Sequence, residues 1–181
     1  MDENIKHEFE KSKSTDKQEQ YEAYQHLLAA TEQKVDWAYD IWDQLIEDLS
    51  DKDNHQRARA AQYLANLAKS DPENRMLRDF SKLWKVTKDE KFVTARHSLK
   101  SIWKVGLAGP EQKELVMHYM VDRFQTCTVE KNYTLIRSDI IQNLKYLYDY
   151  LQEESIKETA LMLIENVEET KYQKKYRSIW K

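Results

Sequence analysis

The sequence has 181 residues, of which 40% are hydrophobic and 34% are charged, and its formal net charge is −3. This length suits one domain large enough to enclose a hydrophobic core. Two glycines and two prolines are too few for the turns of sheets and long loops, so the composition favours helices. No apolar run approaches ~18 residues and the opening MDENIKHEFEKSKST has no apolar segment, so we expect neither a membrane span nor a signal peptide.

Helical periodicity predicts the following elements in chain order. Residues 1–13 are charged and carry few apolar side chains, so we expect a disordered tail. Residues 14–181 are predicted to form one repeat domain, which begins with a helix at about 15–30. The further predicted helices span 35–49, 54–69, 75–86, 91–104, 110–124, 131–150, 155–167 and 171–181.

Four arginines mark a repeat with a period near forty residues. Arg57, Arg96, Arg137 and Arg177 are separated by 39, 41 and 40 residues. Small or apolar side chains follow the first three arginines at offsets of three and seven, which lie on one helical face. Trp103 has the offset of seven after Arg96, so we expect it in the core. Each repeat is therefore a pair of helices, and its arginine lies on the second one.

These residues resemble the HEAT repeats, a family whose units of about 40 residues consist of two antiparallel helices. HEAT repeats typically carry an Asp in the turn between the two helices and an Arg six residues later in the second helix. The corresponding pairs here are Asp51 and Arg57, Glu90 and Arg96, Glu130 and Arg137, and Glu169 and Arg177. The spacing is six residues in the first two pairs and seven or eight in the others, and the proline usual in the first helix is missing.

The resemblance implies an all-α fold, an α-α superhelix (a HEAT-like solenoid) of about four helix pairs plus the N-terminal helix. A carboxylate and a guanidinium can form forked, charge-assisted hydrogen bonds, so we expect the acidic and arginine residues to form a structural ladder. Such a fold specifies almost no function by itself.

The charges differ between the two helices of each pair. The second helices carry a formal charge of +13, which leaves −16 for the rest of the chain. In HEAT-like stacks the second helices line the concave face, so the resemblance implies a basic groove suited to an acidic partner. The candidate binding residues on this face are Arg59, His97, Lys100, Lys104, Lys145 and Lys174.

Signals for catalysis and for metal binding are weak. No two of the five histidines are three or four residues apart, so no helix presents a metal pair. No nucleophile elbow or glycine-rich phosphate loop is present. We therefore expect no catalytic residue, no metal and no cofactor. The single cysteine, Cys127, is typical of a reducing compartment, so we expect a cytoplasmic location.

The leading hypothesis is a non-catalytic scaffold that binds another macromolecule, most often a protein, through an extended concave surface. The alternative is a DNA-binding protein similar to the HEAT-like DNA alkylation-repair glycosylases, which cradle DNA on a basic, aromatic face. That family's tryptophan–aspartate pattern has no definite counterpart here. Convergence of aromatic and acidic side chains in one basic pocket would favour this alternative.

Overall fold

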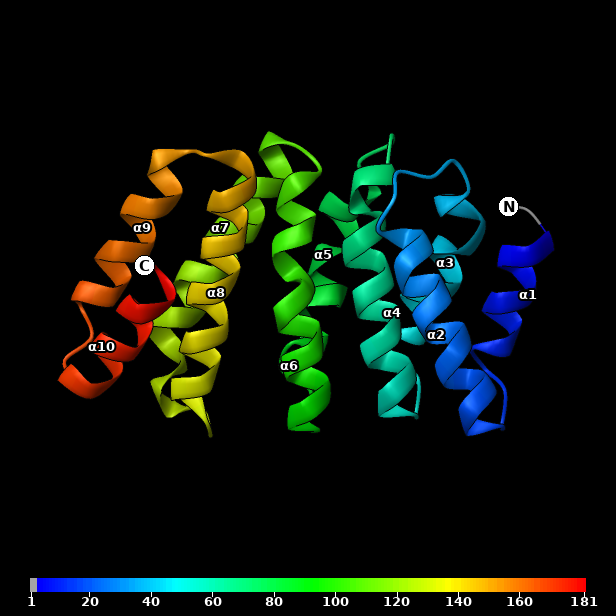
Figure 1. Ribbon diagram of the computed structural model, residues 1–181, viewed down its shortest axis with the longest axis horizontal. Helices are drawn as coiled ribbons and strands as arrows, with labels where there is room; N and C mark the ends of the chain where they lie inside the picture. Colours follow the sequence, from blue (N-terminus) through cyan, green and yellow to red (C-terminus); the bar gives the residue numbers. More distant parts are fainter. Residues whose placement is uncertain (1–2) are drawn as a thin grey trace. The chain divides into compact units, whose positions relative to one another are not determined.

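The computed structural model describes residues 3–181, and every regular element in this range is helical (Figure 1). This result confirms the all-α prediction. The α-helices are α1 (Glu3–Lys11), α2 (Lys17–Thr31), α3 (Ala38–Asp48), α4 (Asn54–Leu67), α5 (Arg75–Val86), α6 (Phe92–Ser101), α7 (Pro110–Thr126), α8 (Tyr133–Leu151), α9 (Glu154–Glu165) and α10 (Thr170–Ile179). Three short 3-10 helices are η1 (Ala68–Ser70), η2 (Ile102–Leu107) and η3 (Cys127–Val129). None of the helices in residues 3–181 is long and apolar enough to cross a membrane.

The chain forms two compact units, where the sequence predicted a single repeat domain over 14–181. The N-terminal unit ends at Ser98 and the C-terminal unit begins at Leu99, so the boundary lies within α6.

The first residues also differ from the sequence-based expectation of a disordered tail over 1–13. Residues 3–11 form α1, which packs against α2. Ser12 is buried, and its carbonyl accepts a hydrogen bond from Gln56 at 3.0 Å. Lys13 forms a 2.8 Å ion pair with Asp48. These contacts tie residues 12 and 13 to α3 and α4, which a count of apolar residues could not reveal. The first two residues of that segment lie outside the described range.

The N-terminal unit has two layers of helices, with α2 and α4 side by side and α3 and α5 behind them (Figure 1). The apolar stripes of these helices meet in a core that includes Trp42, Leu64 and Phe80, none of them more than 1% exposed. The indole Nε1 of Trp42 donates to Asp79 at 3.1 Å, which satisfies the polar atom of this buried ring. The helical periodicity of the sequence reflects these buried faces.

The C-terminal unit is organised around α8, which contacts η2, α7, α9 and α10. Gly106 of η2 lies directly over α8, because a Cβ atom there would be only 3.0 Å from Leu147 Cδ1. Pro110 begins α7 at a position where its missing N–H costs nothing. The hydroxyl of Tyr176, which is fully buried, donates to the Thr134 carbonyl at 2.8 Å and anchors α10 to α8.

Trp103 is not the fully buried core residue that its offset from Arg96 predicted. The α-helix ends at Ser101 and continues as the 3-10 helix η2, which has three residues per turn instead of 3.6. The change in pitch moves Ile102 and Val105 into the core, where both are 0% exposed. Trp103 is left half-buried at the surface of the unit.

Candidate functional site

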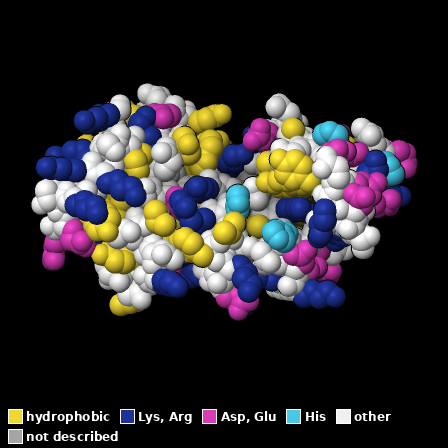
Figure 2. Space-filling model, turned by 60° about the horizontal axis from the view of Figure 1, so that its bottom comes forward, with side chains coloured by type: hydrophobic (Ala, Val, Ile, Leu, Met, Phe, Trp, Pro, Cys, Tyr) yellow, Lys and Arg dark blue, Asp and Glu magenta, His cyan; other side chains and the backbone are white. Residues whose placement is uncertain are grey.

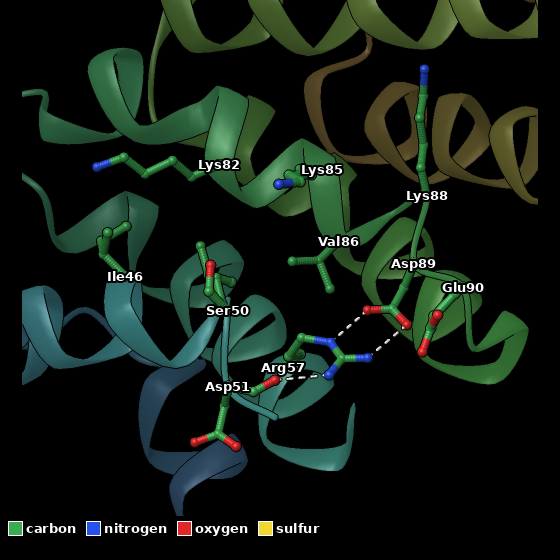
Figure 3. A pocket seen from close by; sticks show the side chains of 11 residues that line it. Ile46, Ser50, Asp51, Arg57, Lys82, Lys85, Val86, Lys88, Asp89 and Glu90 are labelled. Carbon is green, nitrogen blue, oxygen red and sulfur yellow. Dashed lines mark hydrogen bonds and ion pairs between the residues drawn. The ribbon is translucent and has the colours of Figure 1, made fainter. Parts of the chain in front are cut away.

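Arg57 has a structural role, and its carboxylate partner differs from the one expected. Its Nε and Nη2 atoms donate to the two carboxylate oxygens of Asp89 at 2.6 and 2.9 Å (Figure 3). The backbone carbonyl of Asp51, rather than its side chain, accepts from Nη1 at 2.8 Å. The hydrogen bonds with Asp89 raise the pKa of Arg57 despite the opposing effect of burial. The arginine therefore joins the turn between α3 and α4 to the turn between α5 and α6.

The third predicted pair is also rearranged. Glu130 binds Arg123 of α7, whose side chain is 2% exposed, with an Nη2 to Oε2 distance of 3.0 Å. Arg137 instead donates from Nε to the carbonyl of Phe124 at 2.9 Å and lies 4.7 Å from the centroid of that ring. Both arginines hold the turn between α7 and α8.

The second predicted pair is Glu90 and Arg96, and Arg96 contacts an aromatic ring of its own helix. The guanidinium of Arg96 lies 5.9 Å from the ring centroid of Phe92, one turn earlier on α6. Glu90 is exposed and lines the pocket described below.

Arg59 and Lys145, which are among the six candidate cations, make contacts within their own unit. Arg59 lies 5.2 Å from the ring centroid of Tyr24 and donates to the Ser12 carbonyl at 3.5 Å, so α2 and the connection between α1 and α2 partly cover it. Lys145 forms a 2.5 Å ion pair with Asp149 and lies 5.9 Å from the ring centroid of Trp180.

The other four candidates are His97, Lys100 and Lys174, all exposed, and Lys104, which is half-buried. On the face drawn in Figure 2, the basic side chains over the C-terminal unit alternate with hydrophobic ones. The formal charge of the second helices therefore overstates the positive charge available to a partner.

An aromatic cluster lies beside Lys100 in the C-terminal unit. Trp103 packs between two tyrosines of α8, with ring centroids 5.3 Å from Tyr146 and 5.4 Å from Tyr150. The two tyrosines are 44% and 70% exposed, so the cluster faces solvent. We call Lys100, Trp103, Tyr146 and Tyr150 the aromatic–lysine surface.

A pocket of about 500 Å³ adjoins this surface. Lys100 and Tyr146 line it together with Ser138, Asp139, Gln142, Asn143 and Ile179. Asn143 is 1% exposed, and it accepts from the Trp103 backbone N–H at 3.1 Å and donates to the carbonyls of Leu99 and Asp139. The amide of Asn143 therefore fixes η2 against α8 and shapes the pocket floor.

A second, larger pocket of about 830 Å³ lies in the N-terminal unit (Figure 3). The ion pair of Arg57 and Asp89 occupies one side of it, and the ends of α3 and α5 form the walls. Three lysines of α5 and the following turn, namely Lys82, Lys85 and Lys88, follow one border, and Asp51 lies across from them (Figure 3). Within residues 3–181, no three His, Cys, Asp or Glu side chains are arranged to hold a metal ion.

Sequence patterns did not single out Tyr146, Tyr150 or the three lysines of the second pocket. The tyrosines were detectable in principle, because they lie four residues apart on α8 among positions that alternate with core residues. Their association with Trp103 joins residues more than forty positions apart, and no periodicity within one helix reports that contact.

The sequence was compared with models of known protein families and with curated proteins, and neither comparison found a match. The candidate site therefore stands on its geometry and chemistry.

Proposed function

We propose that this protein is a non-catalytic interaction module with HEAT-like helix pairs, and that its aromatic–lysine surface holds an acidic segment of a partner protein. The observation that carries the proposal is the exposure of Tyr146 and Tyr150 around Trp103, together with the pocket that Tyr146 lines with Lys100. Tyrosine and tryptophan rings supply large contact areas at a small cost in conformational entropy, and they are enriched in protein interfaces.

Charge favours an acidic partner. Lys100 is exposed and forms no ion pair or hydrogen bond within residues 3–181, so a carboxylate of the partner can approach it. The adjoining pocket of about 500 Å³ is large enough for a side chain of the partner to enter. The bound segment would thus place an apolar or aromatic side chain against the tyrosines and an Asp or Glu at Lys100.

A reducing compartment such as the cytoplasm is the location that we propose with this function. Cys127, the single cysteine of the chain, is buried, and burial raises the pKa of its thiol. A protonated, buried thiol is a poor nucleophile and stays reduced without difficulty in such a compartment.

Nucleic-acid binding is a second candidate, favoured by one observation. Asp139 and Tyr146 line the same pocket as Lys100. An unstacked base could lie against the tyrosine while its phosphate approaches the lysine. This arrangement also keeps open the DNA-glycosylase alternative, in which Asp139 would act on the base in the pocket.

The test uses fluorescently labelled peptides in which Asp or Glu neighbours Leu, Pro or Tyr, with binding followed by anisotropy. We expect Lys100→Glu and the double change Tyr146→Ala with Tyr150→Ala each to weaken binding about tenfold or more, without loss of helical content. Lys175→Glu and Tyr21→Ala serve as controls, because these side chains are exposed but lie outside the surface. Equal weakening in the controls would contradict the proposal.

A further variant replaces Lys100, Lys104 and Lys145 together by Glu. We expect it to weaken binding of an acidic partner, with most of the effect due to Lys100 because Lys145 is paired with Asp149. A short single-stranded DNA and a DNA duplex form the second arm. Tight binding with a binding constant whose logarithm falls linearly with the logarithm of salt concentration would favour nucleic acid as the partner. No binding at low salt would exclude nucleic acid.

A further inference from the structure

The second pocket, in the N-terminal unit, combines an apolar slot with a basic border. Ile46, Leu49 and Val86 contribute apolar surface from the ends of α3 and α5. Lys85 and Lys88 are exposed at the border, and their side chains form no ion pair or hydrogen bond within the described part of the chain. A suitable occupant therefore presents an apolar side chain flanked by carboxylates.

The same chain carries such a segment on α9 of the C-terminal unit. Met162 is 47% exposed, although methionine is usually buried. Glu158 lies one turn before it on the same helical face, and Glu165 lies three residues after it. Both glutamates are exposed, and neither side chain forms an ion pair or hydrogen bond within residues 3–181.

We propose that α9 of one molecule docks into the N-terminal pocket of a second copy. Met162 enters the apolar slot beside Val86, and the glutamates of α9 face the lysines of α5. Glu158 and Glu165 are separated by about 10 Å along the helix at 1.5 Å per residue, so their carboxylates flank Met162 on both sides. The flexible thioether of methionine adapts well to a pocket of irregular shape.

This contact is heterologous, because the pocket and α9 are different surfaces of the same chain. Each molecule then offers one free pocket and one free α9, so the assembly grows with concentration unless it closes into a ring. The contact is smaller than a standard interface, so we expect a dissociation constant on the order of 100 µM. The assembly is expected to weaken in high salt, because salt screens the exposed charges that form it.

Sedimentation velocity of the full chain between about 20 µM and about 1 mM tests the proposal. The expected result is an average mass that rises with concentration at low salt and returns to that of the monomer at about 0.5 M salt. A monomer at every concentration at low salt would overturn the proposal.

Charge reversal provides the decisive experiment. The pocket variant, Lys85→Glu with Lys88→Glu, and the helix variant, Glu158→Lys with Glu165→Lys, should each raise the dissociation constant about tenfold or more. Each variant alone sets like charges against each other, whereas an equimolar mixture restores opposite charges at the contact. We therefore expect the mixture to associate although neither variant does so alone.

The matched control is Lys17→Glu with Lys34→Glu, which removes the same charge from exposed positions of the N-terminal unit outside the pocket. Association that survives in both pocket and helix variants, or that fails to return in their mixture, would refute the docking of α9. The variants Lys100→Glu and Tyr146→Ala should leave self-association unchanged. Failure of this inference would therefore leave the proposed binding of a partner at the aromatic–lysine surface intact.

Discussion

The guanidinium of Arg57 and the carboxylate of Asp89 form two hydrogen bonds, at 2.6 and 2.9 Å, across 32 residues of sequence. Their side chains are only 15% and 7% exposed. With Asp51 supplying a backbone carbonyl, the pair connects the α3–α4 turn to the α5–α6 turn. It holds one end of the N-terminal unit together and forms a wall of the pocket proposed to bind α9.

The first prediction concerns the stability that this pair provides. Arg57→Ala should lower the free energy of unfolding by about 2–3 kcal/mol, because it leaves the Asp89 carboxylate without its strongest hydrogen bonds. Urea denaturation followed by circular dichroism measures the change. The double variant Arg57→Met with Asp89→Leu should lose less free energy of unfolding than the two single variants lose in sum. Strictly additive losses would contradict an energetic coupling between the two side chains. Lys157→Ala, which breaks an exposed ion pair with Glu154, should have little effect.

The same pair predicts how stability depends on pH in acid. Burial disfavours the charged form of Asp89, but the hydrogen bonds from Arg57 and from the Lys91 N–H outweigh it, so the pKa of Asp89 is lowered. A lowered pKa in the folded state gives stability that is complete above the unfolded pKa of about 3.9 and is lost as the pH falls through the folded value. The free energy of unfolding should therefore differ most between wild type and Asp89→Asn above about pH 4. A difference that does not shrink at lower pH would contradict the assignment.

Two neighbouring residues in η2 should respond differently to truncation. Ile102 is fully buried, so Ile102→Ala should cost about 3–4 kcal/mol of stability. Trp103 lies half-buried between Tyr146 and Tyr150, so Trp103→Ala should cost only about 1–2 kcal/mol despite its larger side chain. Thermal and urea denaturation of the two variants compare these costs. A larger loss of stability for Trp103→Ala than for Ile102→Ala would support the core position that the sequence offset predicted for Trp103.

A side chain at Gly106 should destabilise the protein while Leu147 is present. The added Cβ of Gly106→Ala would lie 3.0 and 3.4 Å from the two methyl carbons of Leu147, which is 0% exposed and tightly surrounded. We expect a loss of about 1–2 kcal/mol from this overpacking. In a Leu147→Ala background the same glycine change should cost almost nothing, because the methyl groups are gone. An equal loss of stability in both backgrounds would show that the strain does not come from the contact with Leu147.

Local sequence signals determined the helices of this protein. The predicted segment 75–86 coincides with α5, and the predicted segments 110–124 and 131–150 lie within two residues of α7 and α8. Apolar periodicity and turn residues such as Pro110 act within a few residues of the chain, so the sequence contains this information directly. Two arginines of the repeat spacing, Arg57 and Arg137, contact backbone carbonyls next to the turns that precede their helices.

Only the tertiary structure decided which side chains meet. The choice of Asp89 over Asp51 as the carboxylate partner of Arg57 depends on how two turns approach each other. The change from α-helix to 3-10 helix after Ser101 moved Trp103 out of the core and onto Tyr146 and Tyr150. The ammonium group of Lys145 is less accessible to a partner than predicted, because it contacts Asp149 and Trp180. Each outcome depends on distances between elements far apart in sequence, which the periodicity of a single helix does not encode.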